Sequence, residues 1–215
     1  MASSCPFDPV GRWTCVQVTV AISHVPVLGT LETVTRAVSD LAISVDGAEG
    51  YAVEWRVRSL DVNSGTRLAR TEIPDALVRH MNVVRRRLIW PVEGDASRVL
   101  LPRATDVTGA RLANPLTDRL PSDPDDPRVF DQDRDGKPGV TVRVRGLARG
   151  EIHVVQRAWS VLTGTVDGRD RVVGTVAWDV EQSVLSATNP VLRNPPENRP
   201  HPDPARSMFT MERVG

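Results

Sequence analysis

The chain has 215 residues, which fits one large domain or two small ones, and all-β domains of this size are commonly single. Lys and Arg number 27 and Asp and Glu also number 27, so the formal net charge is zero. This balance excludes nucleic acid and anionic membrane surfaces as expected partners. No run of about eighteen apolar residues occurs, so no transmembrane helix is predicted. We expect a single β domain over 1–215, and the sequence predicts no particular oligomeric state.

Strands with one helix are predicted for the first half of the chain. Apolar and polar residues alternate there with the period of half-buried strands, and turn residues at 46–50 and 63–65 separate them. Residues 74–81 are the one helical candidate, because Pro74 stands at a first-turn position before Ala, Leu and Val. The strands expected in this half cover 13–22, 31–45, 51–58, 66–73, 83–90 and 98–102.

The second half contains an irregular insertion followed by more strands. Residues 103–139 are mostly polar and rich in proline, and long segments of this kind are usually functional or disordered. Six prolines between 189 and 205 predict an extended connection. Asp167-Gly168 is a hairpin signal between two of the later strands. The strands expected in this half cover 140–145, 151–164, 171–185 and 207–214.

This succession predicts an all-β fold. About eight or more strands with turn signals between them, one short helix and no alternation of strand and helix favour an antiparallel meander. Closing such a sheet into a barrel removes its exposed edges, so a closed barrel is expected. A two-sheet sandwich is the alternative architecture.

The strongest chemical motif lies at the end of the insertion. Asp131, Asp133 and Asp135 occupy every second position and are followed by Gly136, a D-x-D-x-D-G pattern. Such a loop curls its oxygen atoms around a calcium ion, and the carbonyl of Lys137 would be the next ligand. Without a cation, three adjacent carboxylates repel one another, although an acidic surface turn without an ion is the alternative. We predict structural calcium here.

The calcium loop departs from the helix–loop–helix pattern. Its twelfth position, where that pattern has a bidentate Glu, is Val142. The residues after the loop alternate as a strand does, so the loop is expected to precede a strand. The missing acid is predicted to be Asp125 or Asp126, which lie just upstream.

The two cysteines, Cys5 and Cys15, are close enough in sequence to form a disulfide. With a calcium loop in the same chain, a disulfide suggests an extracytoplasmic protein. Free thiols in a reducing compartment are the alternative. A further interpretation makes Cys5 the lipidated cysteine of a bacterial lipoprotein, which leaves Cys15 unpaired. No export signal precedes these residues, so we expect a secreted or lipid-anchored protein whose signal lies outside this sequence.

Gly11-Arg12-Trp13, at the start of the first predicted strand, resembles the G-x-W signature of lipocalin-type (calycin) barrels. The resemblance implies that Trp13 plugs the closed end of a barrel and that an Arg late in the chain packs over it. Arg206 and Arg213 are the candidates for that Arg. Lipocalins lack an acidic calcium loop, so the resemblance implies a lipocalin-like barrel with a calcium-bearing insertion.

The barrel suggests a ligand-binding or structural module. Four aromatic residues are candidates for lining its cavity and for contacting a small apolar ligand or a sugar: Tyr51, Trp55, Trp159 and Trp178. An enzyme that uses the same cavity is the alternative, with polar groups from Glu151 and His153 or from Glu54 and Arg56. No catalytic motif is present, so an enzyme is the less favoured class. An arginine run, 85–87, predicts a basic patch or a charged strand edge.

Overall fold

The computed structural model describes residues 7–25, 29–47, 50–66, 69–146, 149–194 and 197–214. Within them the chain forms eleven strands, one short α-helix and two 3-10 helices. The strands are β1 (Gly11–Val25), β2 (Gly29–Val45), β3 (Tyr51–Asn63), β4 (Ala69–Glu72), β5 (Val84–Leu88), β6 (Arg98–Thr108), β7 (Val140–Gly146), β8 (Gly150–Val166), β9 (Arg171–Ala187), β10 (Asn198–Pro200) and β11 (Met208–Arg213). The helices are α1 (Asp75–His80), η1 (Pro190–Arg193) and η2 (Pro204–Arg206). None of these helices is long and apolar enough to cross a membrane.

All the strands belong to one antiparallel sheet. Its order is β4-β7-β8-β9-β11-β1-β2-β3-β5, while β10 pairs with β1 and β6 pairs with β8. Strands adjacent in sequence form long hairpins, as in β1 with β2 and β8 with β9. The predicted all-β antiparallel fold with one short helix is confirmed.

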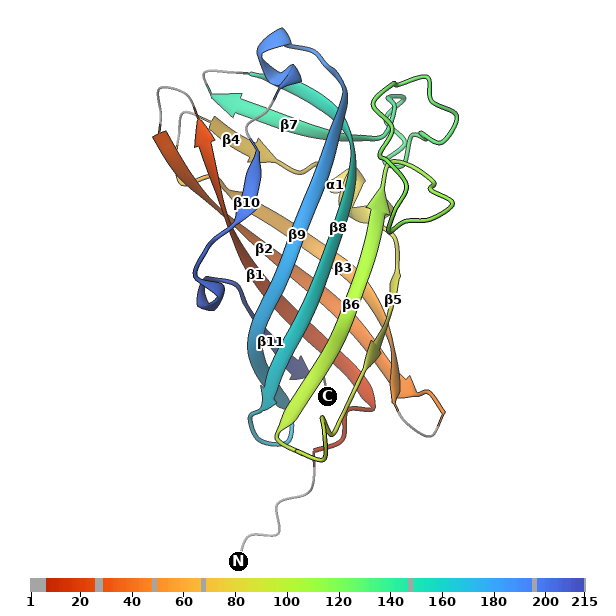
Figure 1. The fold of residues 1–215 in the computed structure, drawn as a ribbon, viewed down its shortest axis with the longest axis vertical. Coiled ribbons are helices and arrows are strands. Elements are labelled where there is room, and N and C mark those ends of the chain that lie inside the picture. Colours follow the sequence, from red (N-terminus) through yellow and green to blue (C-terminus); the bar gives the residue numbers. More distant parts are fainter. Residues whose placement is uncertain are drawn as a thin grey trace, which may run out of the picture.

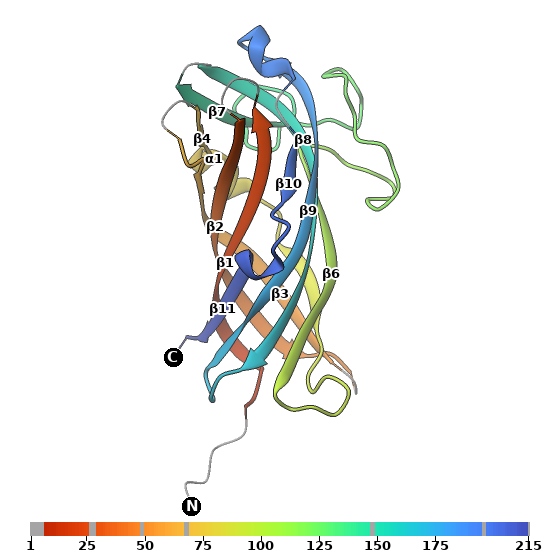
Figure 2. The ribbon, with the colours of Figure 1, turned by 60° about the vertical axis from the view of Figure 1, so that its left-hand side comes forward.

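The sheet curls into an open half-barrel (Figures 1 and 2), and in the view of Figure 1 β6, β8 and β9 cross in front of β1, β2 and β3. Between β5 and β6 its two sides are joined by a bridge, where the Ile89 amide donates to the Leu100 carbonyl at 2.8 Å and the Leu100 amide donates to the Ile89 carbonyl at 3.1 Å. Among the described residues this bridge, and not a continuous ladder, joins β5 to β6. The predicted closed barrel is therefore formed only in part.

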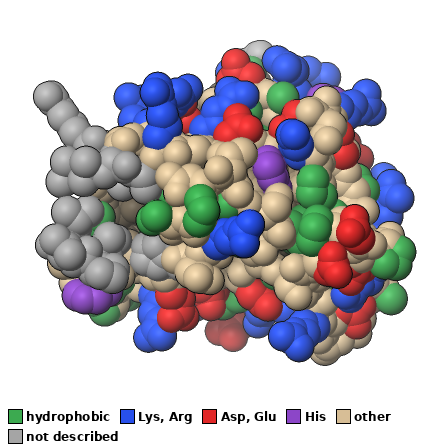
Figure 3. All heavy atoms as spheres, turned by 90° about the horizontal axis from the view of Figure 1, so that it is seen from above, with side chains coloured by type: hydrophobic (Ala, Val, Ile, Leu, Met, Phe, Trp, Pro, Cys, Tyr) green, Lys and Arg blue, Asp and Glu red, His purple; other side chains and the backbone are tan. Residues whose placement is uncertain are grey.

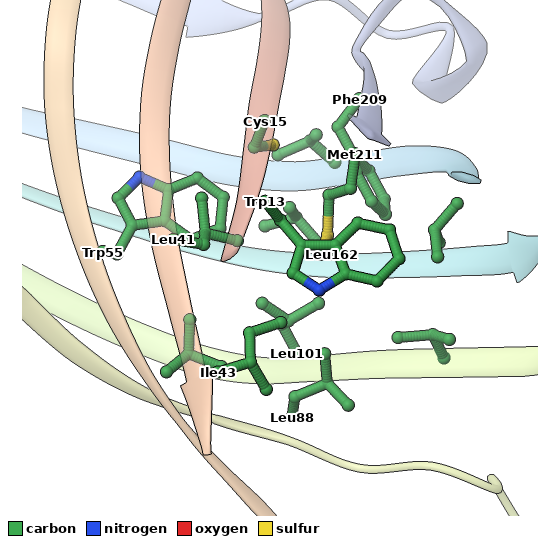
Figure 4. Packing of buried hydrophobic residues seen from close by; sticks show 14 of the residues in the cluster. Trp13, Cys15, Leu41, Ile43, Trp55, Leu88, Leu101, Leu162, Phe209 and Met211 are labelled. Atoms are coloured by element: carbon green, nitrogen blue, oxygen red, sulfur yellow. The ribbon is translucent and has the colours of Figure 1, made fainter. Parts of the chain in front are cut away.

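The lower end of the half-barrel is filled by apolar side chains (Figure 4). Trp13 is 1% exposed and its indole nitrogen donates to the carbonyl of Pro9 at 2.8 Å. The Arg213 guanidinium lies 4.6 Å from the centre of the Trp13 ring. Of the two late arginines, Arg213 therefore covers the tryptophan, while Arg206 pairs with Glu32 on the surface.

The tertiary structure decides which face of β1 is buried. The side that begins with Trp13 and Cys15 faces the interior, and farther along the same side Thr19, Ala21 and Ser23 are also buried. Strand alternation then directs most of the valines of β1 to the outer face. Above the apolar lower end, the interior side of β1 thus carries small and polar side chains.

The insertion is shorter than the sequence suggests. β6 continues to Thr108, so the irregular segment covers 109–139 and not 103–139. Pro102 lies within β6, although proline cannot donate to a sheet ladder. It lies at a register shift between Leu101 and Ala104, where the β6–β8 pairing is interrupted and then resumes. The 189–205 connection contains η1, β10 and η2 among its described residues.

Candidate metal centre

The insertion, residues 109–139, leaves the sheet and returns to it at one point beside β8. Gly109 and Gly139 both have left-handed backbone conformations, with φ of +84° and +80°. A Cβ on Gly109 would lie 2.8 Å from the carbonyl oxygen of Val154, and one on Gly139 would overlap the same oxygen. Phe130 ties both ends together, since its amide donates to Gly109 and its carbonyl accepts from Gly139. Glycine is therefore required at both junctions.

Gln132 fixes the insertion from within, a role that the sequence did not reveal. Its side chain is 6% exposed. The amide oxygen accepts from the Gly109 backbone at 2.7 Å, and the amide nitrogen donates to the carbonyl of His80 at 3.0 Å. One buried side chain thus joins the calcium-loop sequence to the end of β6 and to the end of α1.

The D-x-D-x-D-G residues form a tight turn. Asp131 accepts from the backbone amides of Asp135 and Gly136 at 3.1 and 2.8 Å. Arg134 and Gly136 have positive φ values of 60° and 82°, which this curl requires. Asp135 accepts from the amide of Lys137 at 2.9 Å. The backbone is thus bent so that the three carboxylates converge.

The carboxylates of Asp131, Asp133 and Asp135 each offer an oxygen within 4.8 Å of the other two. Asp133 is 2% exposed, and one of its oxygens accepts from the Thr141 amide at 2.9 Å. The other oxygen is buried without a hydrogen-bond partner. The Thr141 hydroxyl donates to Asp135 at 2.6 Å, so a residue at the start of β7 also holds the cluster in place.

The electrostatics of this cluster disfavour three bare negative charges. Burial raises the pKa of Asp133, and the neighbouring charge of Asp135 raises it further, while the Thr141 amide opposes the shift. A divalent cation would supply the partner that the buried oxygen lacks, because a buried charged group is costly unless it is paired. Carboxylate oxygens in this number suit a hard cation such as calcium.

The upstream acids predicted to complete the site lie outside this group. Asp126 forms an ion pair with Arg128 at 2.7 Å, and the hydrogen bond from Arg128 lowers its pKa to about 2. Asp125 is exposed, and its backbone amide donates to Asp123. Val142, at the twelfth loop position, is 6% exposed and packs in a core cluster with Val140 and Ile152. The Lys137 amide donates to Asp135, and the predicted role of its carbonyl as a ligand stays a prediction.

The four aromatic residues predicted to line a cavity separate into two places. Trp55 is 6% exposed within the main core, and Tyr51 and Trp178 pack against that core. Trp178 donates to Ser207 at 3.0 Å. Trp159 lies on the opposite side of the sheet wall, in a pocket on the outer face. The four residues therefore do not share one cavity, because Trp159 faces outward, and a ligand cavity lined by the other three stays a prediction.

The polar pairs considered for an enzyme do not face the interior. Glu151 pairs with Arg143 at 3.0 Å, and His153 lies on the outer face, bonded to Ser186 at 2.6 Å. Glu54 and Arg56 are exposed, because Val53 and Trp55 occupy the buried side of β3. Strand alternation therefore places all four groups outside the half-barrel.

Strand alternation also separates the three arginines of 85–87 between the two faces of β5. Arg85 and Arg87 are exposed, whereas Arg86 points inward and is 8% exposed. Arg86 donates to the hydroxyl and carbonyl of Ser160 at 3.1 and 3.0 Å and lies 5.2 Å from the Trp55 ring. Burial lowers its pKa to about 10. Basic and acidic side chains lie side by side around the upper end of the molecule (Figure 3).

Cys15 is fully buried within the main core, and burial raises the pKa of its thiol to about 12. It is a free cysteine in the described part of the chain. Cys5 lies outside the described residues, so the predicted disulfide and the alternative lipid anchor both stay predictions.

No protein-family model, no curated protein and no solved structure matches this chain.

Proposed function

We propose that the protein is a calcium-stabilised, extracytoplasmic β protein that acts as a binding or structural module. The observation that carries the proposal is the buried oxygen of Asp133, which lacks a hydrogen-bond partner and lies among two further carboxylates. A calcium ion at that point neutralises the cluster. It also holds the insertion against the outer face of the sheet.

The interior of the half-barrel is poorly suited to a small apolar ligand. Its lower end is filled by the main core, and the buried side of β1 above it carries Thr19 and Ser23. A small apolar ligand would have to displace packed side chains or lie against polar ones, and burying unpaired polar groups is unfavourable. We therefore assign the binding or structural role to the outer face of the sheet, where calcium would hold the insertion. The resemblance to lipocalin-type barrels stays confined to the Trp13–Arg213 end.

Thermal unfolding with calcium, with magnesium and with chelator tests the metal proposal. Calcium is expected to raise the unfolding midpoint, because a ligand that binds only the folded state stabilises it, by about 2.7 kcal/mol at a hundredfold excess over Kd. Asp133→Asn should abolish the response. Asp125→Asn, in the same insertion but outside the cluster, is the matched control and should respond as the parent protein does.

An unchanged midpoint in calcium and in chelator, together with no calcium in elemental analysis of the purified protein, would contradict the proposal. A response of equal size in Asp133→Asn would place the ion elsewhere. Magnesium is expected to act more weakly, since it demands a stricter octahedral geometry and gives up its water reluctantly.

A further inference from the structure

A pocket of about 190 Å³ lies on the outer face of the sheet, where β6, β8 and β9 meet the insertion. The insertion projects from this side of the molecule, beside the upper ends of β6 and β8 (Figure 1). The pocket is smaller than the roughly 300–1,000 Å³ of sites for drug-sized ligands. Its size suits a single small ring or a short chain.

The floor of the pocket is a row of three side chains from three strands. Trp159 of β8 pairs in register with Thr105 of β6 on one side and with Asp179 of β9 on the other. The next residue of β8, Ser160, contacts the inward-pointing Arg86. Alternation therefore directs Trp159 and both its neighbours to the outer face, side by side.

The walls of the pocket are charged but balanced. The Arg103 guanidinium lies 4.2 Å from the centre of the Trp159 ring. On the adjacent row, Arg157 pairs with Glu181, with 3.1 Å between Nε and Oε2. These two arginines and the acids Asp179 and Glu181 give the lining a formal charge of zero.

The insertion supplies the rim. Arg157 donates to the carbonyls of Pro115 and Asp118 at 3.1 and 2.8 Å. Leu116, between them, lines the pocket and is 64% exposed. The same arginine thus organises the wall of the pocket and ties the insertion to the sheet.

Two groups on the floor have hydrogen-bonding capacity that the described protein does not use. The hydroxyl of Thr105 is buried without a partner. Asp179 is exposed, and in the described part of the chain it accepts a hydrogen bond from the adjacent amide of Val180. Buried hydroxyl groups are normally hydrogen-bonded, so the Thr105 hydroxyl retains the capacity for a hydrogen bond that a ligand at the pocket floor could supply.

The chemistry of the pocket selects a neutral ligand rich in hydroxyl groups. An apolar ligand would leave the Thr105 hydroxyl and the Asp179 carboxylate unpaired. An anion would approach two carboxylates, and a cation would approach two guanidinium groups. A sugar ring has apolar C–H surface for the indole of Trp159, hydroxyl donors for Asp179, and oxygen acceptors for Thr105 and Arg103.

We propose that this outer pocket binds one neutral sugar residue of a glycan and that calcium strengthens the binding by holding the insertion in place. The pocket itself follows from the sheet register and the orphaned hydroxyl. The calcium dependence rests on the proposed function, because the insertion carries both the Asp cluster and the pocket rim.

Neutral hexoses and N-acetylhexosamines, alone and as short oligosaccharides, are the probes, titrated into the full chain in calcium and followed by saturation-transfer NMR and tryptophan fluorescence. At least one probe is expected to bind saturably. Thr105→Val and Asp179→Asn nearly preserve side-chain volume and should each weaken that binding about tenfold or more. Trp159→Ala should abolish it. Asp40→Asn, on the outer face of β2, is the matched control and should bind as the parent protein does.

Absence of saturable binding for the whole panel, or equal affinity in Thr105→Val, Asp179→Asn and Asp40→Asn, overturns the pocket assignment. Chelator is expected to weaken sugar binding at least severalfold. Unchanged sugar affinity in chelator, while calcium raises the unfolding midpoint, overturns the coupling. Sugar binding that depends on Thr105 in a protein with no calcium response supports the pocket and contradicts the metal proposal instead, so the two failures are distinguishable.

Discussion

The lower end of the half-barrel and the insertion are held to the same sheet by different forces. At the lower end Trp13, Leu41 and Phe209 are each at most 2% exposed, and their apolar contact area stabilises the fold. The insertion has only a small apolar cluster around Val155 and Leu185. Its position depends mainly on hydrogen bonds made by Gln132 and Arg157 and on the clustered carboxylates of Asp131, Asp133 and Asp135. The lower end should therefore control global stability, and the insertion should respond to ions and local changes.

Replacing Trp13 should cause the largest effect. Trp13→Ala removes a fully buried aromatic side chain and leaves a cavity beneath Arg213, which costs about 3–5 kcal/mol in the free energy of unfolding. Urea unfolding followed by circular dichroism measures the loss. Trp159→Ala, a partly exposed tryptophan on the outer face, is the control and should cost clearly less. Equal losses would show that the two regions do not differ in this way.

Replacing Gly139 tests the junction between the insertion and the sheet. Gly139→Ala forces a left-handed conformation on alanine, at about 1–2 kcal/mol, and drives its Cβ into the Val154 carbonyl, which adds about 1–3 kcal/mol. Gly168→Ala is the matched control, because Gly168 has a similar φ of +77° but nothing lies within 4 Å of its added Cβ. Urea midpoints that fall equally in both variants would refute the claim that Gly139 is required because its backbone lies against the Val154 carbonyl of β8.

The smallest expected effect concerns the Asp126–Arg128 pair within the insertion. The hydrogen bond from Arg128 lowers the pKa of Asp126 to about 2, below its ordinary value. A carboxyl whose pKa is depressed on folding stabilises the folded state above its ordinary pKa, and this contribution is lost as the pH falls toward 2. NMR titration should show the Asp126 pKa returning toward its ordinary value in Arg128→Gln. Arg119→Gln, another exposed arginine of the insertion, should leave it unchanged.

Local sequence patterns predicted most of the strands. Alternation placed β1, β2, β3, β8 and β9, and Asp167-Gly168 marked the hairpin between the last two. The D-x-D-x-D-G spacing also placed the Asp cluster, because its turn is made by hydrogen bonds within a few residues. The strand predicted over 98–102 was too short, since a register shift in the β6–β8 pairing accommodates Pro102 and β6 continues to Thr108.

The parts that were missed depend on contacts between distant residues. Gln132 reaches Gly109 and His80, and neither partner is marked by a local motif. The orientation of β1 depends on which of its faces packs into the core, so alternation alone could not choose between them. The same holds for Arg86, which a charged run suggested to be exposed.

By itself, the sequence determined the strand content, the tight turns and the convergence of Asp131, Asp133 and Asp135, because each follows from neighbours along the chain. Only the tertiary structure placed β6 and β7 on the same side of β8, so that the insertion leaves and returns at Val154. That placement also formed the outer pocket around Trp159. Strand pairing joins residues far apart in sequence. Its energy depends on burial and on register, and the local alternation of apolar and polar residues specifies neither.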